Sequence, residues 1–190
     1  IVDISNPSSP STTAVQYKGD SANNTGQLDV QGNYAYIANA DSSTFNIIDV
    51  SNPDLPVVMS TTTQASRKIA VNGNYAYINT TNSIVVYDVS DPANPVFAGQ
   101  LTGLTSFSRL ATKGNYLFAI INSGTVNAFR VFDVSDPTAP TQAASVNLPV
   151  SVDFNSDLLV QGSYVYIGHT GDDLTIMDIT DPTNPYATFG

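Results

Sequence analysis

The chain has no cysteine, no tryptophan and no glutamate, and it has one histidine among 190 residues. The absence of cysteine excludes disulfide bonds, thiolate metal sites and cysteine nucleophiles. All sixteen acidic residues are aspartates. Aspartate favours turns, whereas the absent glutamate is a good helix former. The composition therefore predicts an all-β chain with many turns and almost no helix.

Basic residues are also scarce, because six lysines and arginines stand against the sixteen aspartates and leave a net charge of −10. A field of this sign repels nucleic acid and anionic membranes, so we expect neither as a partner. No apolar run approaches the roughly 20 residues of a membrane-spanning helix, so no membrane insertion is expected. The many Ser, Thr, Asn and Gly residues favour an extracellular or cell-surface location.

What the chain has instead is internal repetition. Strings like DVSDPANP (residues 88–95) occur five times, with first aspartates 46, 39, 45 and 45 residues apart. A second motif, GNYAYI or a close variant, alternates with them. The period is typical of a propeller blade of roughly 40 to 50 residues. The motifs begin at Asp3, Asp49, Asp88, Asp133 and Asp178, and at Gly32, Gly73, Gly114 and Gly162.

One unit shows how a blade is expected to form. Residues 68–71 and 75–79 predict two strands joined by a hairpin turn at Asn72 and Gly73. Residues 84–89 and 95–101 predict the third and fourth strands. Bulky side chains on both faces of the second strand indicate a sheet that packs between two neighbouring sheets.

The repeats predict an all-β β-propeller of four-stranded antiparallel blades, with four complete blades and an N-terminal half-blade. The half-blade supplies only strands three and four, so other protein chains or the missing part of its own chain must complete it. The expected segments are the half-blade at 1–17 and blades at 18–63, 64–102, 103–147 and 148–190.

The string between the third and fourth strands predicts a stiff corner. Pro92 presets the turn, and Pro95 starts the next strand where no backbone donor is needed. Asp88 ends the third strand, and the side chains of Ser90 and Asp91 can bind nearby backbone N–H groups. Calcium at each corner is the alternative. We favour the turn, because the corners carry too few carboxylates close together.

The pairing of GNYAYI with IIDVSNP or VVYDVSDP resembles the LVIVD repeat of secreted and surface proteins of bacteria and archaea. The match is best at residues 32–56 and 73–95, and the resemblance covers essentially the whole chain. It implies a β-propeller and no particular reaction, because propellers host many functions.

Alignment on the GNY turn places Lys68 and Arg109 at one position of the predicted first strand, which lines the channel of a propeller. The other two units carry Gln27 and Asp157 there. With neighbouring Arg67, the two cations are expected to form a channel-mouth site for a carboxylate or an acidic sugar. The alternative is that these cations pair with nearby aspartates.

No cofactor is expected, although Asp153, Asn155 and Asp157 match the first half of a calcium loop. That loop lacks its glycine and its glutamate, so calcium is the alternative to a plain turn. Asn23 and Asn79 begin Asn-X-Thr sequences, which makes glycosylation a hypothesis at both.

These features favour a non-catalytic extracellular propeller that acts as a scaffold or binding module, with glycans among its candidate partners, within a larger surface or secreted protein. The alternatives are a filament subunit joined through the half-blade and a propeller enzyme acting on polysaccharide. We expect no enzyme, because the single histidine, His169, allows no catalytic triad. In addition, the predicted first strands carry only Asp29 and Asp157 as carboxylates, two or more units apart.

Overall fold

The computed structural model describes residues 1–13, 25–40, 42–104, 107–122, 127–148, 156–169 and 174–189. Across these ranges the chain forms strands and turns and no helix, which confirms the predicted all-β class. The described part accordingly offers no helix with the length and apolar character needed to cross a membrane.

The strands form four four-stranded antiparallel sheets, which we call blades 1 to 4, and one two-stranded sheet. Within each blade the strands pair in chain order. The two-stranded sheet contains β1 (Val2–Asp3) and β2 (Ser11–Thr12). Blade 1 contains β3 (Thr25–Gln31), β4 (Tyr34–Asn39), β5 (Thr44–Asp49) and β6 (Val57–Thr63); blade 2 contains β7 (Ile69–Asn72), β8 (Tyr75–Asn79), β9 (Ser83–Asp88) and β10 (Val96–Thr102). Blade 3 contains β11 (Phe107–Lys113), β12 (Tyr116–Asn122), β13 (Asn127–Asp133) and β14 (Thr141–Asn147); blade 4 contains β15 (Asp157–Gln161), β16 (Tyr164–Gly168), β17 (Leu174–Asp178) and β18 (Tyr186–Phe189).

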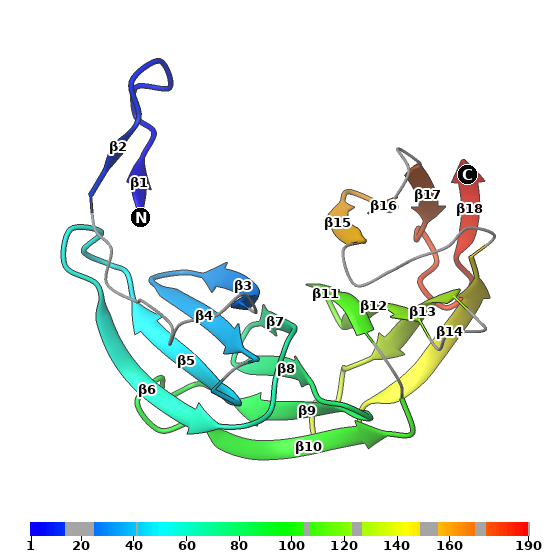
Figure 1. Cartoon of the computed structure of the whole chain (residues 1–190). Helices are drawn as coiled ribbons and strands as arrows, with labels where there is room; N and C mark the ends of the chain where they lie inside the picture. Colours follow the sequence, from blue (N-terminus) through cyan, green and yellow to red (C-terminus); the bar gives the residue numbers. More distant parts are fainter. Residues whose placement is uncertain are drawn as a thin grey trace.

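The four blades follow one another along a curve, with β3, β7, β11 and β15 on its inside (Figure 1). Contacts between successive inner strands join each blade to the next. The β1–β2 hairpin lies at one end of the curve, beside blade 1, and β18 lies at the other end (Figure 1). This arrangement confirms the predicted propeller of four blades with an additional pair of N-terminal strands.

The hydrophobic core is divided among the junctions between blades. In one cluster, Tyr77 and Val86 of blade 2 pack with Leu110 and Phe132 of blade 3. Similar clusters join blade 1 to blade 2 and blade 3 to blade 4. Side chains on both faces of β8 are buried, as the sequence predicts for a sheet between two sheets.

A two-residue hairpin turn connects the first and second strands of each blade. In blade 2, Asn72 pairs with Tyr75, so the central residues are Gly73 and Asn74 and not the predicted Asn72 and Gly73. The φ angle of Gly73 is +56°, in the left-handed region where a glycine is free of strain. Glycine in the first central position fits a type II′ turn, which suits the twist of a hairpin.

Aspartate side chains hold the corner between the third and fourth strands. Asp88 Oδ1 accepts a hydrogen bond from the backbone N–H of Ser90 at 2.8 Å, and Asp91 Oδ1 accepts one from Ala93 at 3.0 Å. The first of these bonds recurs in all five copies at 2.7 to 2.8 Å. The structure thus forms the predicted turn, with the Asp88 carboxylate as the acceptor for the Ser90 N–H.

Candidate functional site

The last side chain of β3, β7 and β11 binds the hairpin glycine of the next blade. Gln31 Nε2 donates to the carbonyl oxygen of Gly73 at 2.6 Å, and Gln31 Oε1 accepts the Gly73 N–H at 2.9 Å. At the next junction, Asn72 Nδ2 donates to the carbonyl oxygen of Gly114. At the junction after that, Lys113 Nζ donates to the carbonyl oxygen of Gly162. Gln161 has this position in blade 4, where it is exposed and has no hydrogen-bond partner among the described residues. The Gln161 side chain therefore occupies the position that binds a hairpin glycine at the other three inner strands, but it has no such contact in the described structure.

Each blade has a side that faces the next blade, which we call its forward face. In blade 2 this face consists of Ala70, Tyr77, Ile84 and Val86, all buried against blade 3. The same positions of blade 4 hold Leu159, Tyr166, Leu174 and Ile176. Leu159 is 61% exposed and Leu174 is 41% exposed, because no described residue covers them. The forward face of blade 4 is thus an apolar surface with the residue pattern of a blade junction.

The opposite side of blade 1 is also uncovered at its inner strand. Ile69 and Val71 of β7 are buried against blade 1. Their counterparts in β3, Leu28 and Val30, are exposed. Both ends of the described curve therefore present apolar side chains that inner blades bury.

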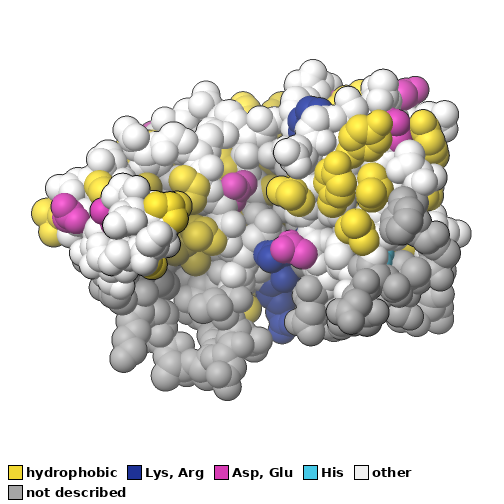
Figure 2. All heavy atoms as spheres, turned by 90° about the horizontal axis from the view of Figure 1, so that it is seen from above, with side chains coloured by type: hydrophobic (Ala, Val, Ile, Leu, Met, Phe, Trp, Pro, Cys, Tyr) yellow, Lys and Arg dark blue, Asp and Glu magenta, His cyan; other side chains and the backbone are white. Residues whose placement is uncertain are grey.

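Three cations gather on the inside of the curve. Figure 2 looks into this side and shows Lys and Arg side chains in its middle, with an acidic side chain beside them. Arg109 Nε donates to Asp157 Oδ1 at 2.7 Å, which links blade 3 to blade 4. Lys68 is half-buried, and its pKa is lowered first by burial and then by the charge of Arg109; the charge of Asp157 opposes this shift, and Arg67 adds to it.

The structure therefore places the three predicted cations, Arg67, Lys68 and Arg109, near one another. It also gives Arg109 the aspartate partner that the alternative foresaw. Within the described ranges, neither Arg67 nor Lys68 has a carboxylate at salt-bridge distance. Two of the three positive charges are thus left without an ion-pair partner in the described structure.

The two inner-strand carboxylates are engaged in contacts between blades. Asp29 Oδ2 accepts the backbone N–H of Val71 at 2.7 Å. Asp157 binds Arg109, as described above, and also accepts the N–H of Leu158 at 2.8 Å. Each carboxylate therefore has a structural role.

Of the predicted calcium residues, Asp153 and Asn155 lie outside the described residues. The third, Asp157, is paired with Arg109. Across the described ranges, no three His, Cys, Asp or Glu side chains come together in a way that could hold a metal ion. Calcium binding at the 153–157 loop stays the alternative to a plain turn.

Of the two glycosylation candidates, Asn23 lies outside the described residues. Asn79 is 5% exposed. Its Oδ1 accepts the backbone N–H groups of Lys68 at 2.6 Å and Arg67 at 3.2 Å. A glycan needs an exposed amide, so the folded structure counts against glycosylation at Asn79. The side chain instead positions the backbone that carries two of the clustered cations, a role that the sequence analysis missed.

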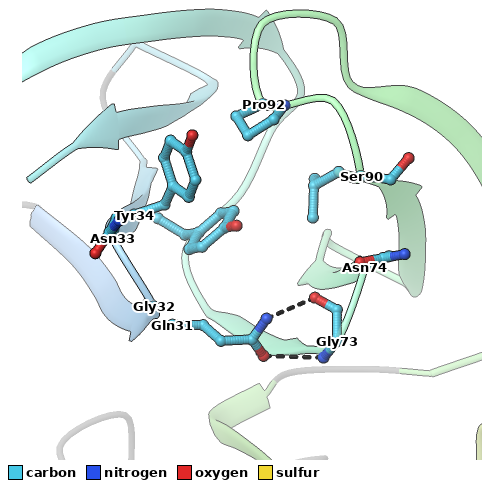
Figure 3. Close-up of a pocket in the computed structure, with 10 residues that line it drawn as sticks. Gln31, Gly32, Asn33, Tyr34, Gly73, Asn74, Ser90 and Pro92 are labelled. Carbon is cyan, nitrogen blue, oxygen red and sulfur yellow. Dashed lines mark hydrogen bonds between the residues drawn. The ribbon is translucent and has the colours of Figure 1, made fainter. Parts of the chain in front are cut away.

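A groove of about 320 Å³ lies between blades 1 and 2 (Figure 3). The paired Gln31 and Gly73 close one side of it (Figure 3). Its lining consists of Gln31, Gly32, Asn33, Tyr34, Tyr36, Gly73, Asn74, Val89, Ser90 and Pro92, without a charged side chain. Nothing in the sequence marks this groove, because the tyrosines of the GNYAY motif have the pattern of ordinary core positions of a strand.

The blades and their junctions define the class of this protein as a β-propeller. The family model of the LVIVD repeat matches residues 1–14, 22–63, 65–102, 106–148 and 155–189. The chain belongs to the LVIVD repeat family, and the predicted resemblance is confirmed.

No curated protein matches the chain. Among solved structures, it is similar to two putative 6-phosphogluconolactonases. The one from Bacteroides fragilis NCTC 9343 has a TM-score of 0.72 at 10% identity, over 98% of this chain and 62% of that one. The one from Bacteroides uniformis ATCC 8492 has a TM-score of 0.70 at 12% identity, over 86% and 53%. The computationally designed Ika4 protein gives a TM-score of 0.56 at 14% identity, over 85% and 94%. These likenesses show the fold alone, and the chain spans less than two thirds of each Bacteroides protein.

Proposed function

We propose that the chain is a non-catalytic part of a larger extracellular propeller, where it acts as a scaffold and binding module. In this proposal a further blade of the same protein covers the forward face of blade 4. The observation that carries the proposal is the exposure of Leu159 and Leu174 at positions that are buried at the inner junctions.

Two further observations support this assignment. Gln161 presents an exposed side-chain amide at the position from which Gln31 binds the hairpin glycine of the next blade. The similar Bacteroides proteins are longer than this chain, which spans 62% and 53% of them. A further blade with a glycine hairpin would bury the apolar surface and pair with Gln161.

A non-catalytic role is supported by the contacts of the acidic groups on the inner strands. Asp29 and Asp157 are engaged with Val71 and Arg109, respectively. A carboxylate that acts as a general acid or base must instead reach the substrate. The single histidine also supports a non-catalytic role. Its Nε2 atom lies 2.8 Å from Thr175 Oγ1, so this ring nitrogen is engaged in a hydrogen bond within blade 4.

The binding part of the proposal concerns the cluster of Arg67, Lys68 and Arg109. Lys68 is half-buried, so solvent screens its charge less than it screens a cation in open water, and Lys68 attracts an anion more strongly. We assign this cluster to a carboxylate or an acidic sugar, consistent with the bidentate fit of arginine to carboxylates.

The first experiment is hydroxyl-radical footprinting of two samples, the isolated 190-residue chain and the native material that contains it. Tyr164 of β16 is 40% exposed, and its counterpart Tyr75 packs at the junction of blades 2 and 3. We expect Leu159, Tyr164 and Leu174 to be modified in the isolated chain and protected several-fold in the native material. Phe97 is exposed on the outer strand β10 and serves as the control that reacts equally in both.

The mass of the native chain separates the two explanations of protection. A mass well above 20.1 kDa agrees with a further blade of the same protein. A native chain of 20.1 kDa that assembles into filaments would replace the proposal by the filament alternative. If blade 4 is equally reactive in both samples, no blade covers it and the proposal is wrong.

The binding assignment is tested by calorimetric titration with trigalacturonate. The change Lys68→Gln introduces the residue that blade 1 carries at this position, Gln27, and should weaken binding at least tenfold. The control is Lys113→Gln, because Lys113 is the last residue of β11 and lies away from the cluster. This change removes the same charge and introduces the residue that blades 1 and 4 carry at this position, Gln31 and Gln161. Binding to the unmodified chain should weaken as salt is raised. Absence of binding, or equal weakening in both variants, would contradict the assignment.

A further inference from the structure

We propose that the groove between blades 1 and 2 binds a neutral sugar ring. This site differs from the cationic cluster, because it lies at the opposite end of the inner strands. Lys68 lies just before β7 and Gly73 just after it. Five residues of extended strand span about 16 Å. The sugar proposal therefore does not depend on the acidic ligand.

The chemistry of the lining indicates the class of ligand. Tyr34 and Pro92 contribute apolar surface, and Asn74 and Ser90 contribute polar groups. Binding sites for small molecules typically combine a mainly apolar lining with a few placed polar groups. Because the lining has no charged side chain, it suits a neutral ligand that has both C–H faces and hydroxyl groups. A volume of about 320 Å³ suits one sugar ring more than a chain of sugars.

The Tyr36 side chain gives the second observation. Tyr36 lines the groove, and its hydroxyl group has no hydrogen-bond partner among the described residues, so it is open to a ligand or to water there. Burial, followed by the nearby Tyr34 and Asp29, raises the pKa of Tyr36, so its hydroxyl keeps its proton at neutral pH and can donate it. A sugar hydroxyl in the groove would supply the partner.

Packing of the blade does not require this hydroxyl group. Blade 3 carries Phe118 at the position of Tyr36, where it is fully buried and stacks on Phe129 with ring centroids 5.9 Å apart. A phenylalanine thus fills the same place in the same repeat. The Tyr36 hydroxyl is therefore not needed for packing, and of the three tyrosines at this position, Tyr36, Tyr77 and Tyr166, it is Tyr36 that lines this groove.

The rim of the groove is already fixed before a ligand binds. The two hydrogen bonds between Gln31 and Gly73 tie the blade 1 strand to the blade 2 hairpin (Figure 3). On the other side, the N–H of Val89 donates to the Asn74 carbonyl oxygen at 2.7 Å. A preorganised rim lowers the entropic cost of binding a small ligand.

The test uses nitrogen-15 NMR of the 190-residue chain titrated with three probes: methyl α-glucopyranoside, methyl β-galactopyranoside and N-acetylglucosamine. We expect at least one probe to shift the amide signals of Gly73, Asn74 and Ser90 in a saturable way. The change Tyr36→Phe should weaken this binding at least fivefold and leave the thermal unfolding midpoint almost unchanged.

The matched control is Tyr77→Phe, which removes the hydroxyl at the equivalent position of blade 2 and should leave binding unchanged. Lys68→Gln should also leave it unchanged, which separates this site from the cationic cluster. The proposal is overturned if none of the three probes shifts these amides, or if Tyr36→Phe and Tyr77→Phe weaken binding equally.

Discussion

The junction between blades 2 and 3 and the open side of blade 4 have equivalent sequence positions but differ in burial. Ile84 is 1% exposed at the junction, whereas Leu174, its counterpart in blade 4, is 41% exposed. Both side chains are large and apolar, which is typical of positions that are buried in a junction between blades. The difference predicts that a blade gains much of its stability from its neighbour, as in other repeat architectures.

The largest effect should come from removing equivalent apolar side chains on the two sides of this comparison. Ile84→Ala leaves a cavity in a closed junction and should lower the free energy of unfolding by about 2–5 kcal/mol. Leu174→Ala in the isolated chain should lower it by less than about 1 kcal/mol, because this side chain is already in contact with water. Urea unfolding of both variants measures the difference. Equal losses would show that the open face is covered in solution.

A smaller effect should come from the glutamines that bind, or are placed to bind, the next hairpin. Gln31→Ala removes two hydrogen bonds to Gly73 and should cost about 1–2 kcal/mol. Gln161→Ala should cost almost nothing in the isolated chain. In native material with a further blade, the two changes should cost similar amounts. Urea unfolding checks both, and a large loss for Gln161→Ala in the isolated chain would reveal a partner there.

The smallest difference is expected at the corners, because their geometry is the same in both regions. Asp88 Oδ1 accepts the Ser90 N–H at 2.8 Å, and Asp178 Oδ1 accepts the Thr180 N–H at 2.7 Å. Asp88→Ala and Asp178→Ala should therefore shift the urea midpoint downward to a similar extent. Unequal shifts would mean that burial of the blade face changes the strength of the corner.

The corners also predict a dependence of stability on pH. The N–H of Ser90 and then its side chain lower the pKa of Asp88, and the corresponding donors of Thr180 lower that of Asp178. A carboxyl with a lowered pKa in the folded state stabilises the fold above its unfolded pKa, near 3.9, and loses this contribution as pH falls through the folded value. The urea concentration at the midpoint of unfolding should therefore be constant above about pH 5 and decrease as the pH is lowered toward 2. A midpoint unchanged at pH 2 would contradict the role of these carboxylates.

Much of the fold could be predicted, because its signals are local. The strand at residues 75–79 was predicted with its observed bounds, and the corner was predicted as a turn held by side chains. The acceptor role predicted for Asp91 is confirmed, whereas the role predicted for Ser90 belongs to Asp88. The hairpin turn was placed one residue early, at Asn72 and Gly73. Asn-Gly is a strong turn signal, but here the repeat needs its glycine in the first central position.

The candidate sites were less predictable, because they depend on residues far apart in the chain. Aligning the repeats brought Lys68 and Arg109 to one position of the inner strands. Pairing of Arg109 with Asp157 was foreseen only as a general alternative, because the two residues are 48 apart and meet through blade packing. The sequence also marked Asn79 as a glycan acceptor, whereas its burial against the backbone of Lys68 gives it a structural role.

By itself, the sequence determined the period of the repeat, the four strands of each blade and the turns between them. These features depend on side chains that act on backbone groups a few residues away, so their information is local. Only the tertiary structure decided which forward faces are buried, which cation has a carboxylate partner and where the tyrosines border a groove. Such outcomes depend on how one blade packs on the next, and equivalent residues in different copies of a repeat acquire different neighbours.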